Sequence, residues 1–202
     1  MNILIADDHN LFREGISSLI NNAMPDAQLT CVESLADIEG QLESATHYHI
    51  ILVDLSMPGM HGVRSIRKLA EQTTSPLLVI SAEESPETMQ ACMSAGASGY
   101  LPKSSDTDLM LQTIQSLLAG GQYMSAEARK HKPLKISHRQ EEVLMCIAEG
   151  KSNREIADVL NITEGTVKQY VSVLLRMLDV DNRTRAAAKA KKLLGLNVNP
   201  EA

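Results

Sequence analysis

The sequence predicts two domains of different class, an α/β domain with a five-stranded, doubly wound parallel sheet and an all-α domain of four helices. In the first 120 residues, short apolar runs alternate with amphipathic stretches, the pattern of strands interleaved with helices. Beyond residue 135, the apolar side chains recur only at helical spacing. The 202-residue chain is long enough for two hydrophobic cores. We expect the first domain at 1–120, a linker at 121–134 and the second domain at 135–198.

Five apolar runs are expected to form the strands of the first domain. They lie at 2–7, 28–33, 49–54, 76–81 and 98–101. The stretches between them carry apolar residues at helix spacing, for example Phe12, Ile16 and Ile20. Strands that alternate with helices favour parallel pairing, with helices on both faces of the sheet. Ligands of such sheets bind at the carboxyl ends of the strands.

Four helices are expected in the second domain, each preceded by a residue that can cap it. They lie at 138–149, 153–160, 164–178 and 183–194, with Ser137, Ser152, Thr163 and Asn182 as N-caps. Glu155 follows Ser152 by three residues, which completes a capping box. Only residues 161–163 separate the two middle helices, and this spacing is typical of a helix-turn-helix.

The net charge differs between the two parts of the chain. Residues 1–120 hold 5 Lys/Arg and 15 Asp/Glu, a net of −10, whereas residues 121–202 hold 14 and 10, a net of +4. This difference in net charge has two interpretations. The two halves are solvated surfaces of different composition, or an acidic regulatory half is joined to a basic half that binds a polyanion. The stretch from Gly120 to Pro133 contains two glycines and a proline, and we expect one short helix in it, at 125–130.

Several classes of protein are excluded by composition. No apolar stretch approaches the roughly 18 residues that span a bilayer, and the N-terminus lacks the basic segment of a signal peptide. Cys31, Cys92 and Cys146 are odd in number and far apart, so they form neither a disulfide framework nor a zinc site. We therefore expect a cytoplasmic protein that does not interact with membranes.

Polar residues follow four of the expected strands. Asp7 and Asp8 end the first strand, Asp54 ends the third, Ser81 ends the fourth, and Lys103 follows the fifth. Any single Asp at a strand end could be a turn residue, but the whole set predicts a site. Carboxylates packed together repel one another unless a cation lies between them, and oxygen ligands of this kind suit Mg²⁺. A carboxylate can also attack phosphorus and form an aspartyl phosphate, whose oxygens Ser81 and Lys103 could bind.

Residues 1–120 resemble the flavodoxin-like receiver domain of bacterial two-component response regulators. The matching elements are Asp7-Asp8, Asp54 followed by Met57-Pro58 and Gly62, Ser81-Ala82, Gly96-Ala97, and Gly99-Tyr100-Leu101-Pro102-Lys103. The resemblance implies that Asp54 is the phosphoacceptor and that Asp8, Asp54 and the Ser56 main-chain carbonyl hold Mg²⁺, with Asp7 acting mainly through water. It implies that Lys103 and Ser81 stabilise the phosphoryl group, and that Ser81 and Tyr100 form the switch.

The receiver motif departs from the family pattern beside Lys103. Many receivers have a proline after this lysine, whereas here Ser104 follows it and Pro102 precedes it. The isomer of the Leu101–Pro102 peptide bond is therefore left open. His9, beside the acidic pair, and His61 have no second histidine at ligand spacing, so we expect local structural roles for both.

Residues 134–196 resemble the LuxR-type helix-turn-helix of the NarL/FixJ response regulators. The matching stretches are Arg139-Gln140-Glu141-Glu142-Val143-Leu144, Gly150-Lys151-Ser152-Asn153-Arg154-Glu155-Ile156-Ala157, Thr166-Val167-Lys168 and Asn182-Arg183-Thr184. Tyr170 and Met177 depart from the pattern, since a histidine and a lysine are common there. A missing cation at Met177 would remove one phosphate contact.

The expected recognition helix has one apolar stripe, formed by Val167, Val171, Leu174, Leu175 and Leu178, which must face the core of the domain. On the opposite side, Lys168, Gln169 and Ser172 could contact base edges in the major groove. Ser152, Asn153, Thr166 and Arg183 lie at helix starts, where they could bind DNA phosphates. Any one of them could equally be an ordinary solvent-facing residue.

We therefore predict a phosphorylation-dependent transcription factor and no enzyme of external substrates. A sensor histidine kinase would phosphorylate Asp54, and the receiver would control DNA binding as a homodimer on two half-sites. Ala187, Ala190 and Leu194 are a candidate dimer surface. Three alternatives remain: a DNA binder that uses the receiver only as a dimerisation module, a regulator that binds protein and no DNA, and a phosphatase with Asp54 as nucleophile. Haloacid-dehalogenase-like phosphatases need a second Asp two residues on, where this chain has Ser56.

Overall fold

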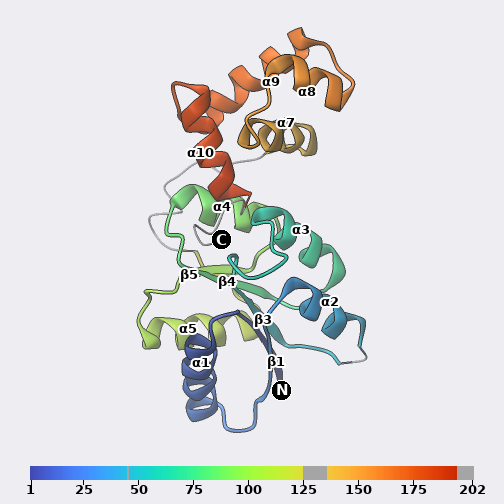
Figure 1. The fold of residues 1–202 in the computed structure, drawn as a ribbon. Coiled ribbons are helices and arrows are strands. Elements are labelled where there is room, and N and C mark those ends of the chain that lie inside the picture. Colours follow the sequence, from blue (N-terminus) through green and yellow to red (C-terminus); the bar gives the residue numbers. More distant parts are fainter. Residues whose placement is uncertain (45, 125–135, 195–202) are drawn as a thin grey trace. The chain divides into compact units, whose positions relative to one another are not determined.

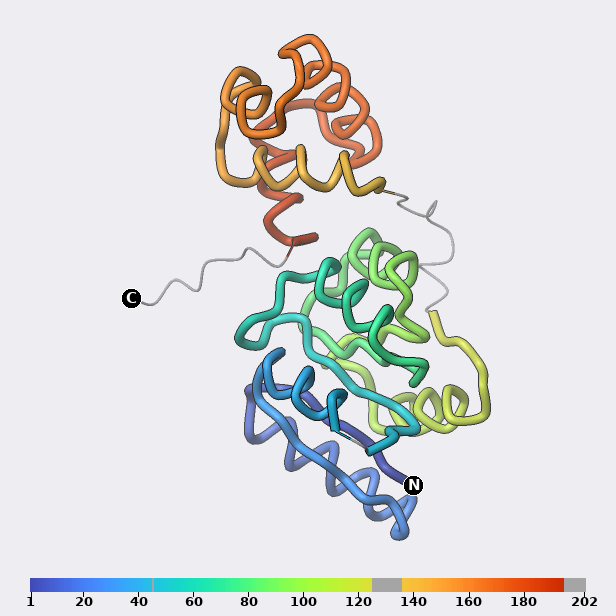
Figure 2. The backbone as a smooth tube through the Cα atoms, turned by 90° about the vertical axis from the view of Figure 1, so that its right-hand side faces the viewer, coloured from blue at the N-terminus to red at the C-terminus, as the bar shows by residue number. Residues whose placement is uncertain are grey.

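The computed structural model describes residues 1–44, 46–124 and 136–194, which belong to two compact units, Met1–Pro133 and Leu134–Ala202. Figure 2 traces the first unit from blue to yellow-green and the second from orange to red. The short helix expected at 125–130 lies outside the described residues. None of the described helices is long and apolar enough to cross a lipid bilayer.

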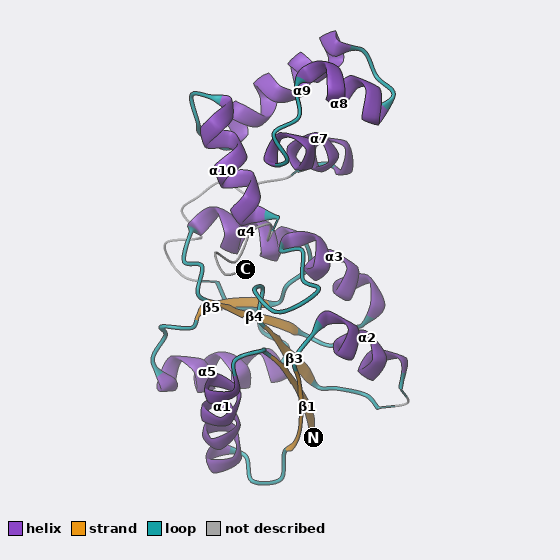
Figure 3. Cartoon of the chain, in the orientation of Figure 1, coloured by secondary structure: helices purple, strands orange, loops and turns teal. Residues whose placement is uncertain are grey.

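The first unit is built on a five-stranded parallel sheet, as the sequence predicts (Figures 1 and 3). Its strands are β1 (Asn2–Ala6), β2 (Gln28–Val32), β3 (Ile50–Val53), β4 (Leu77–Ser81) and β5 (Gly99–Pro102). Their order in the sheet is β2-β1-β3-β4-β5, and every neighbouring pair is parallel. The order reverses direction next to β1, and such a switch point opens a crevice at the carboxyl ends of the strands.

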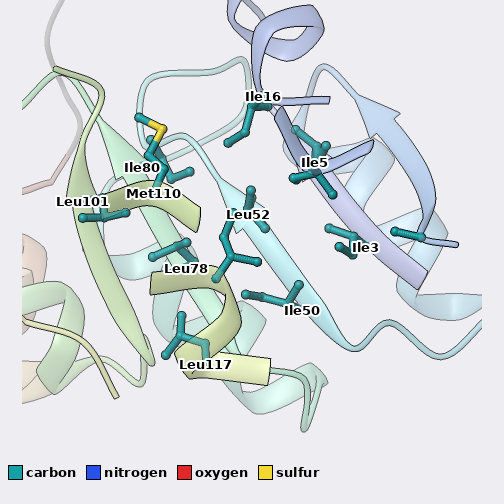
Figure 4. Packing of buried hydrophobic residues seen from close by; sticks show 13 residues of the cluster. Ile3, Ile5, Ile16, Ile50, Leu52, Leu78, Ile80, Leu101, Met110 and Leu117 are labelled. Atoms are coloured by element: carbon teal, nitrogen blue, oxygen red, sulfur yellow. The ribbon is translucent and has the colours of Figure 1, made fainter. Parts of the chain in front are cut away.

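Five helices connect and cover the strands. They are α1 (Asn10–Ala23), α2 (Leu35–Glu43), α3 (Val63–Gln72), α4 (Pro86–Ser94) and α5 (Thr107–Leu118). Helices α1 and α5 lie on one face of the sheet, and α2, α3 and α4 lie on the other (Figure 1). Alternate strand residues such as Ile3, Ile5, Ile50 and Leu52 face α1 and α5, so one aliphatic core forms between them (Figure 4).

Four of the five strands end one residue away from the predicted position, and β2 does so at Val32. Strands β1 and β3 end one residue before Asp7 and Asp54, although the main-chain N–H of each aspartate still donates to a carbonyl of the neighbouring strand. Strand β5 extends through Pro102, which lacks an N–H donor but is tolerated because β5 is an edge strand of the sheet. No described peptide bond is cis, so the Leu101–Pro102 bond is trans.

The described part of the second unit is purely helical, as predicted. It contains α7 (His138–Ala148), α8 (Asn153–Leu160), α9 (Glu164–Met177) and α10 (Arg183–Leu193). All four predicted N-caps accept a hydrogen bond from the first turn of their helices, and Ser137 and Ser152 each form a complete capping box. The C-cap of α8, Asn161, has φ of 51°, a left-handed conformation that Asn tolerates and that turns the chain into α9.

Candidate functional site

The carboxylates of Asp7 and Asp54 lie side by side where β1 and β3 end. Main-chain hydrogen bonds hold both residues, because the Asp54 N–H donates to the Ala6 carbonyl at 2.9 Å and the Asp7 N–H donates to the Val32 carbonyl at 3.1 Å. Only 2% of Asp7 and 1% of Asp54 is exposed. Two buried carboxylates next to a single ammonium group, that of Lys103, are costly to keep ionised. This cost indicates a functional site rather than an ion pair that stabilises the fold.

Lys103 joins the two carboxylates. Its Nζ lies 2.7 Å from Asp7 Oδ2 and 3.0 Å from Asp54 Oδ2. The main-chain N–H of Lys103 donates to the Ser81 carbonyl at 2.8 Å, which holds the backbone of the lysine beside the end of β4. The ammonium group also lies 4.8 Å from the centre of the Phe12 ring, in a cation–π contact. Lys103, which directly follows β5, thus reaches across the sheet edge to both acidic residues.

The pKa values of Asp54 and Lys103 are both shifted by burial and by neighbouring charges. Burial raises the pKa of Asp54, the nearby Lys103 lowers it in part, and the charge of Asp7 raises it again, so that the net shift is upward. Burial alone would lower the pKa of Lys103, but its hydrogen bonds and ion pairs with Asp7 and Asp54 outweigh this effect and raise it. Lys103 therefore remains a cation next to Asp54.

The acidic cluster fits a divalent cation. Asp7, Asp8, His9 and Asp54 each offer one ligand atom, and these atoms all lie within 4.8 Å of one another. The second carboxylate oxygen of Asp54, Oδ1, is buried and has no hydrogen-bond partner among the described residues. An oxygen left without a partner in such surroundings suits a hard ion such as Mg²⁺. The role expected for the Ser56 carbonyl stays a prediction.

The two predicted switch residues both hold the loop between β4 and α4. Ser81 Oγ accepts a hydrogen bond from the Glu83 N–H at 3.2 Å, and the Tyr100 hydroxyl donates to the Glu83 carbonyl at 2.6 Å. The Tyr100 ring points inward, with 1% of the residue exposed, and this burial raises the pKa of its hydroxyl. A change at Ser81 is thereby linked to Tyr100 through the main chain of one residue, Glu83.

Sequence reasoning missed two side chains near the site. Arg13 is buried on α1, where it donates to the Asp7 carbonyl at 2.5 Å, to Asn10 Oδ1 at 3.1 Å and to the Glu33 carboxylate. Ser104 Oγ donates to Glu84 Oε1 at 2.6 Å and so links the loops after β5 and β4. An arginine within an amphipathic helix gives no sequence signal of burial, since only the tertiary fold places it under the β1–α1 loop.

In the second unit, the predicted base-contacting residues lie on the outer side of α9. Lys168, Gln169 and Ser172 are all exposed. Within the opposite stripe, Val167, Leu174 and Leu178 are buried, whereas Val171 and Leu175 are only partly covered. The helix therefore presents a polar face that can enter a DNA groove.

The predicted phosphate-binding residues are brought together in part. Arg183 donates to Asn153 Oδ1 at 3.0 Å and also to the Lys151 carbonyl, so the starts of α10 and α8 are in contact. Ser152 is exposed and serves as the cap of α8. Thr166 belongs to a different helix start, where its Oγ1 lies 2.9 Å from Thr163 Oγ1. At position 177, where a lysine is common in the family, Met177 Sδ accepts a weak hydrogen bond from the Gln140 side chain.

The structure buries part of the candidate dimer surface on the last helix, and the role of this helix in a dimer stays a prediction. Ala190 and Leu194 are buried within the chain, and α10 packs against α7. The alanine-rich side of the helix is used for this close packing, because small side chains let two helices approach. Of the three predicted residues, only Ala187 is partly exposed.

Two protein-family models match the chain. Residues 3–115 match the response regulator receiver domain, and residues 134–190 match the luxR family of bacterial regulatory proteins. The glycerol metabolism activator of Pseudomonas putida is 35% identical, over 93% of this chain and 94% of that protein. The nitrate/nitrite response regulator NarL of Escherichia coli is 31% identical, over 92% of each. The transcriptional regulatory protein DegU of Brevibacillus brevis is 32% identical, over 94% of this chain and 92% of that one.

Solved structures confirm the fold. The response regulator RcsB of Salmonella enterica serovar Typhimurium, bound to promoter rprA in the presence of the phosphomimetic BeF₃⁻, has a TM-score of 0.68 at 21% identity. That match covers 96% of this chain and 99% of the other. Both the family models and the curated relatives extend across the receiver and the helix-turn-helix. The chain therefore belongs to the two-component response regulators that carry a receiver domain followed by a LuxR-type DNA-binding domain.

Proposed function

We propose that this response regulator is controlled by phosphorylation of Asp54 by a sensor histidine kinase, and that the phosphorylated form binds promoter DNA as a dimer. The observation that carries the proposal is the arrangement at Asp54. One of its oxygens is paired with Lys103, and the other is buried without a partner beside two more carboxylates. A carboxylate prepared in this way is suited to nucleophilic attack on phosphorus.

In the proposed reaction, a carboxylate oxygen of Asp54 attacks the phosphorus of a phosphohistidine. A phosphorus–oxygen bond forms as the phosphorus–nitrogen bond breaks, and the imidazole leaves with the bonding electron pair. Lys103 stabilises the negative charge on the transferred group, and Ser81 donates a hydrogen bond to it. Mg²⁺ held by Asp7, Asp8, Asp54 and the Ser56 carbonyl supplies further charge neutralisation when it is bound.

The output runs through the β4–α4 loop. When Ser81 turns toward the phosphoryl group, it leaves the Glu83 N–H, and the loop that Tyr100 also holds must rearrange. This change favours dimers, in which two copies of α9 present Lys168, Gln169 and Ser172 to successive half-sites. Ser152, Asn153, Thr166 and Arg183 contact the phosphates. Since the promoter is in the cytoplasm, the protein acts there.

The direct test is radiolabelled acetyl phosphate in the presence of Mg²⁺. The wild-type chain should acquire an acid-stable, base-labile label typical of an acyl phosphate, and Asp54→Asn should acquire none. Asp26→Asn, which removes an exposed carboxylate outside the site, is the matched control and should be labelled normally. Equal labelling of Asp54→Asn would place the phosphoacceptor elsewhere.

A second measurement separates this proposal from the alternatives. Promoter binding by the wild-type chain should tighten with BeF₃⁻ and Mg²⁺, and the footprint should cover two half-sites. An affinity that does not change would favour a receiver that serves only for dimerisation. Absence of a shift over a salt series would favour a regulator that binds protein, and steady release of phosphate from small phosphoesters would favour a phosphatase.

A further inference from the structure

The side chain of His9 lies within the acidic cluster. Its Nδ1 is 2.8 Å from Asp8 Oδ1 and 3.2 Å from Asp7 Oδ1, although 65% of the side chain is exposed. The fold also holds the residue from the main chain, because the His9 N–H donates to Asp7 Oδ1 at 2.9 Å. The imidazole is therefore directed at the oxygens that the proposed cation would use.

Lys103 and His9 use different oxygens of the cluster. Lys103 contacts Oδ2 of Asp7 and Oδ2 of Asp54, whereas His9 lies beside Oδ1 of Asp7 and Oδ1 of Asp8. The Oδ1 atom of Asp54 is buried and has no hydrogen-bond partner in the part of the chain that the structure describes. The lysine can thus keep its ion pairs while a cation occupies the Oδ1 side of the same cluster.

The spacing of these atoms matches the ligand shell of one ion. With metal–ligand bonds of about 2.1 Å, two ligands at a right angle lie about 3 Å apart. The distances of 2.8 and 3.2 Å from His9 Nδ1 to the two carboxylates bracket that value. Three oxygens and one nitrogen form a mixed donor set, and imidazole nitrogen favours first-row transition metals over Mg²⁺.

We propose that His9 is a metal ligand, and that the receiver site binds transition-metal dications more tightly than Mg²⁺ because of it. The inference rests on the proposed function only in that the same carboxylates hold the cation. The contribution of the imidazole should increase along the series Mg²⁺, Mn²⁺, Ni²⁺, as the affinity for nitrogen ligands does. An ion pair between a protonated His9 and the carboxylates would give the opposite result, since it would compete with every cation.

The test is calorimetric titration of the full chain and of His9→Asn with Mg²⁺, Mn²⁺ and Ni²⁺. The variant should weaken Ni²⁺ binding by at least about tenfold, Mn²⁺ binding by roughly threefold and Mg²⁺ binding by less than about twofold. Pulsed EPR of bound Mn²⁺ should show nitrogen coupling in the wild-type chain and none in His9→Asn. A variant that binds all three ions equally weakly, or binds Mg²⁺ more tightly, would overturn the proposal.

A matched control comes from another pair of imidazoles. The exposed rings of His47 and His49 have centres 5.6 Å apart, so Ni²⁺ binding at these imidazoles has to be separated from binding at His9. His47→Asn should remove only the Ni²⁺ binding that Mg²⁺ does not displace. Nitrogen coupling to Mn²⁺ that persists in His9→Asn but disappears in His47→Asn would contradict the inference. The phosphorylation of Asp54 is measured separately on the wild-type chain in Mg²⁺. A failure there would reject the proposed function and leave the metal titrations interpretable.

Discussion

The receiver site and the recognition helix differ in how their functional side chains meet the solvent. Asp7, Asp54 and Ser81 are almost completely buried at the edge of the sheet, and Lys103 is 17% exposed. Lys168 and Gln169 project from α9 into solvent. A buried charge must be paired, so each member of the receiver site affects the stability of the fold as well as its chemistry. The exposed side chains of the recognition helix should affect mainly what it binds.

The largest effect is expected from Lys103→Met. The change leaves Asp7 and Asp54 buried without their shared cation, and we expect a loss of about 3 kcal/mol in the free energy of unfolding at pH 7. The pKa of Asp54, already raised by burial, rises further without Lys103. When the pKa of an acid is higher in the folded state than in the unfolded state, the protein becomes less stable as the pH rises above the unfolded-state pKa. The stability difference between Lys103→Met and the wild-type chain should therefore shrink toward pH 4.

Urea unfolding followed by circular dichroism between pH 4 and pH 7 measures this dependence. The exposed Lys68, paired with Glu39 on the surface, provides the control Lys68→Met, which should change stability by less than about 1 kcal/mol. A Lys103→Met deficit that is the same at both pH values would mean that lost packing, rather than charge, explains it.

A smaller effect is expected from Arg13→Met. The variant leaves the Asp7 carbonyl without its buried donor, and we expect it to cost about 2 kcal/mol. Because Arg13 holds the main chain of a proposed ligand, it should also slow labelling of Asp54 by acetyl phosphate. Arg185→Met removes an exposed arginine of α10 and should leave both quantities unchanged. Normal labelling in Arg13→Met would show that the β1–α1 loop keeps its position without the guanidinium group.

Within the second unit, Asn182→Ala should cost about 1 kcal/mol, because the side chain of this N-cap accepts the Arg185 N–H at 2.9 Å. Asn182→Ser, which also caps helices, should recover most of the loss. Thermal unfolding followed by circular dichroism measures both variants. If Asn182→Ala matches the wild-type chain, solvent satisfies the first turn of α10 as well as the cap does.

The smallest effect on stability is expected from Lys168→Ala and Gln169→Ala. Both should leave the free energy of unfolding within about 0.5 kcal/mol of wild type, since the side chains are exposed. Their effect should instead be on DNA, where losing a base contact costs about 1–3 kcal/mol and relaxes specificity at one position. Competition binding with promoter variants measures this. Uniform weakening across all sequences would identify phosphate contacts instead.

Much of the fold could be predicted from the sequence because its signals are local. The alternation of apolar runs with amphipathic stretches predicted five parallel strands, and the capping residues Ser137, Ser152, Thr163 and Asn182 marked the start of each helix in the second unit. The failures concern packing. Ala190 of α10 was expected at a dimer surface, but a small residue can serve either an intermolecular or an intramolecular contact, and here it is buried within the chain, where α10 packs against α7.

The sequence by itself determined which residues stand at the carboxyl ends of the strands, since strand periodicity and parallel topology place Asp7, Asp54, Ser81 and Lys103 at one edge. Only the tertiary structure decided which of their atoms meet. It paired Lys103 with Oδ2 of two carboxylates, left Oδ1 of Asp54 without a partner, directed His9 at the cluster and buried Arg13 beneath it. These contacts depend on side-chain directions between segments distant in sequence, and no local pattern encodes them.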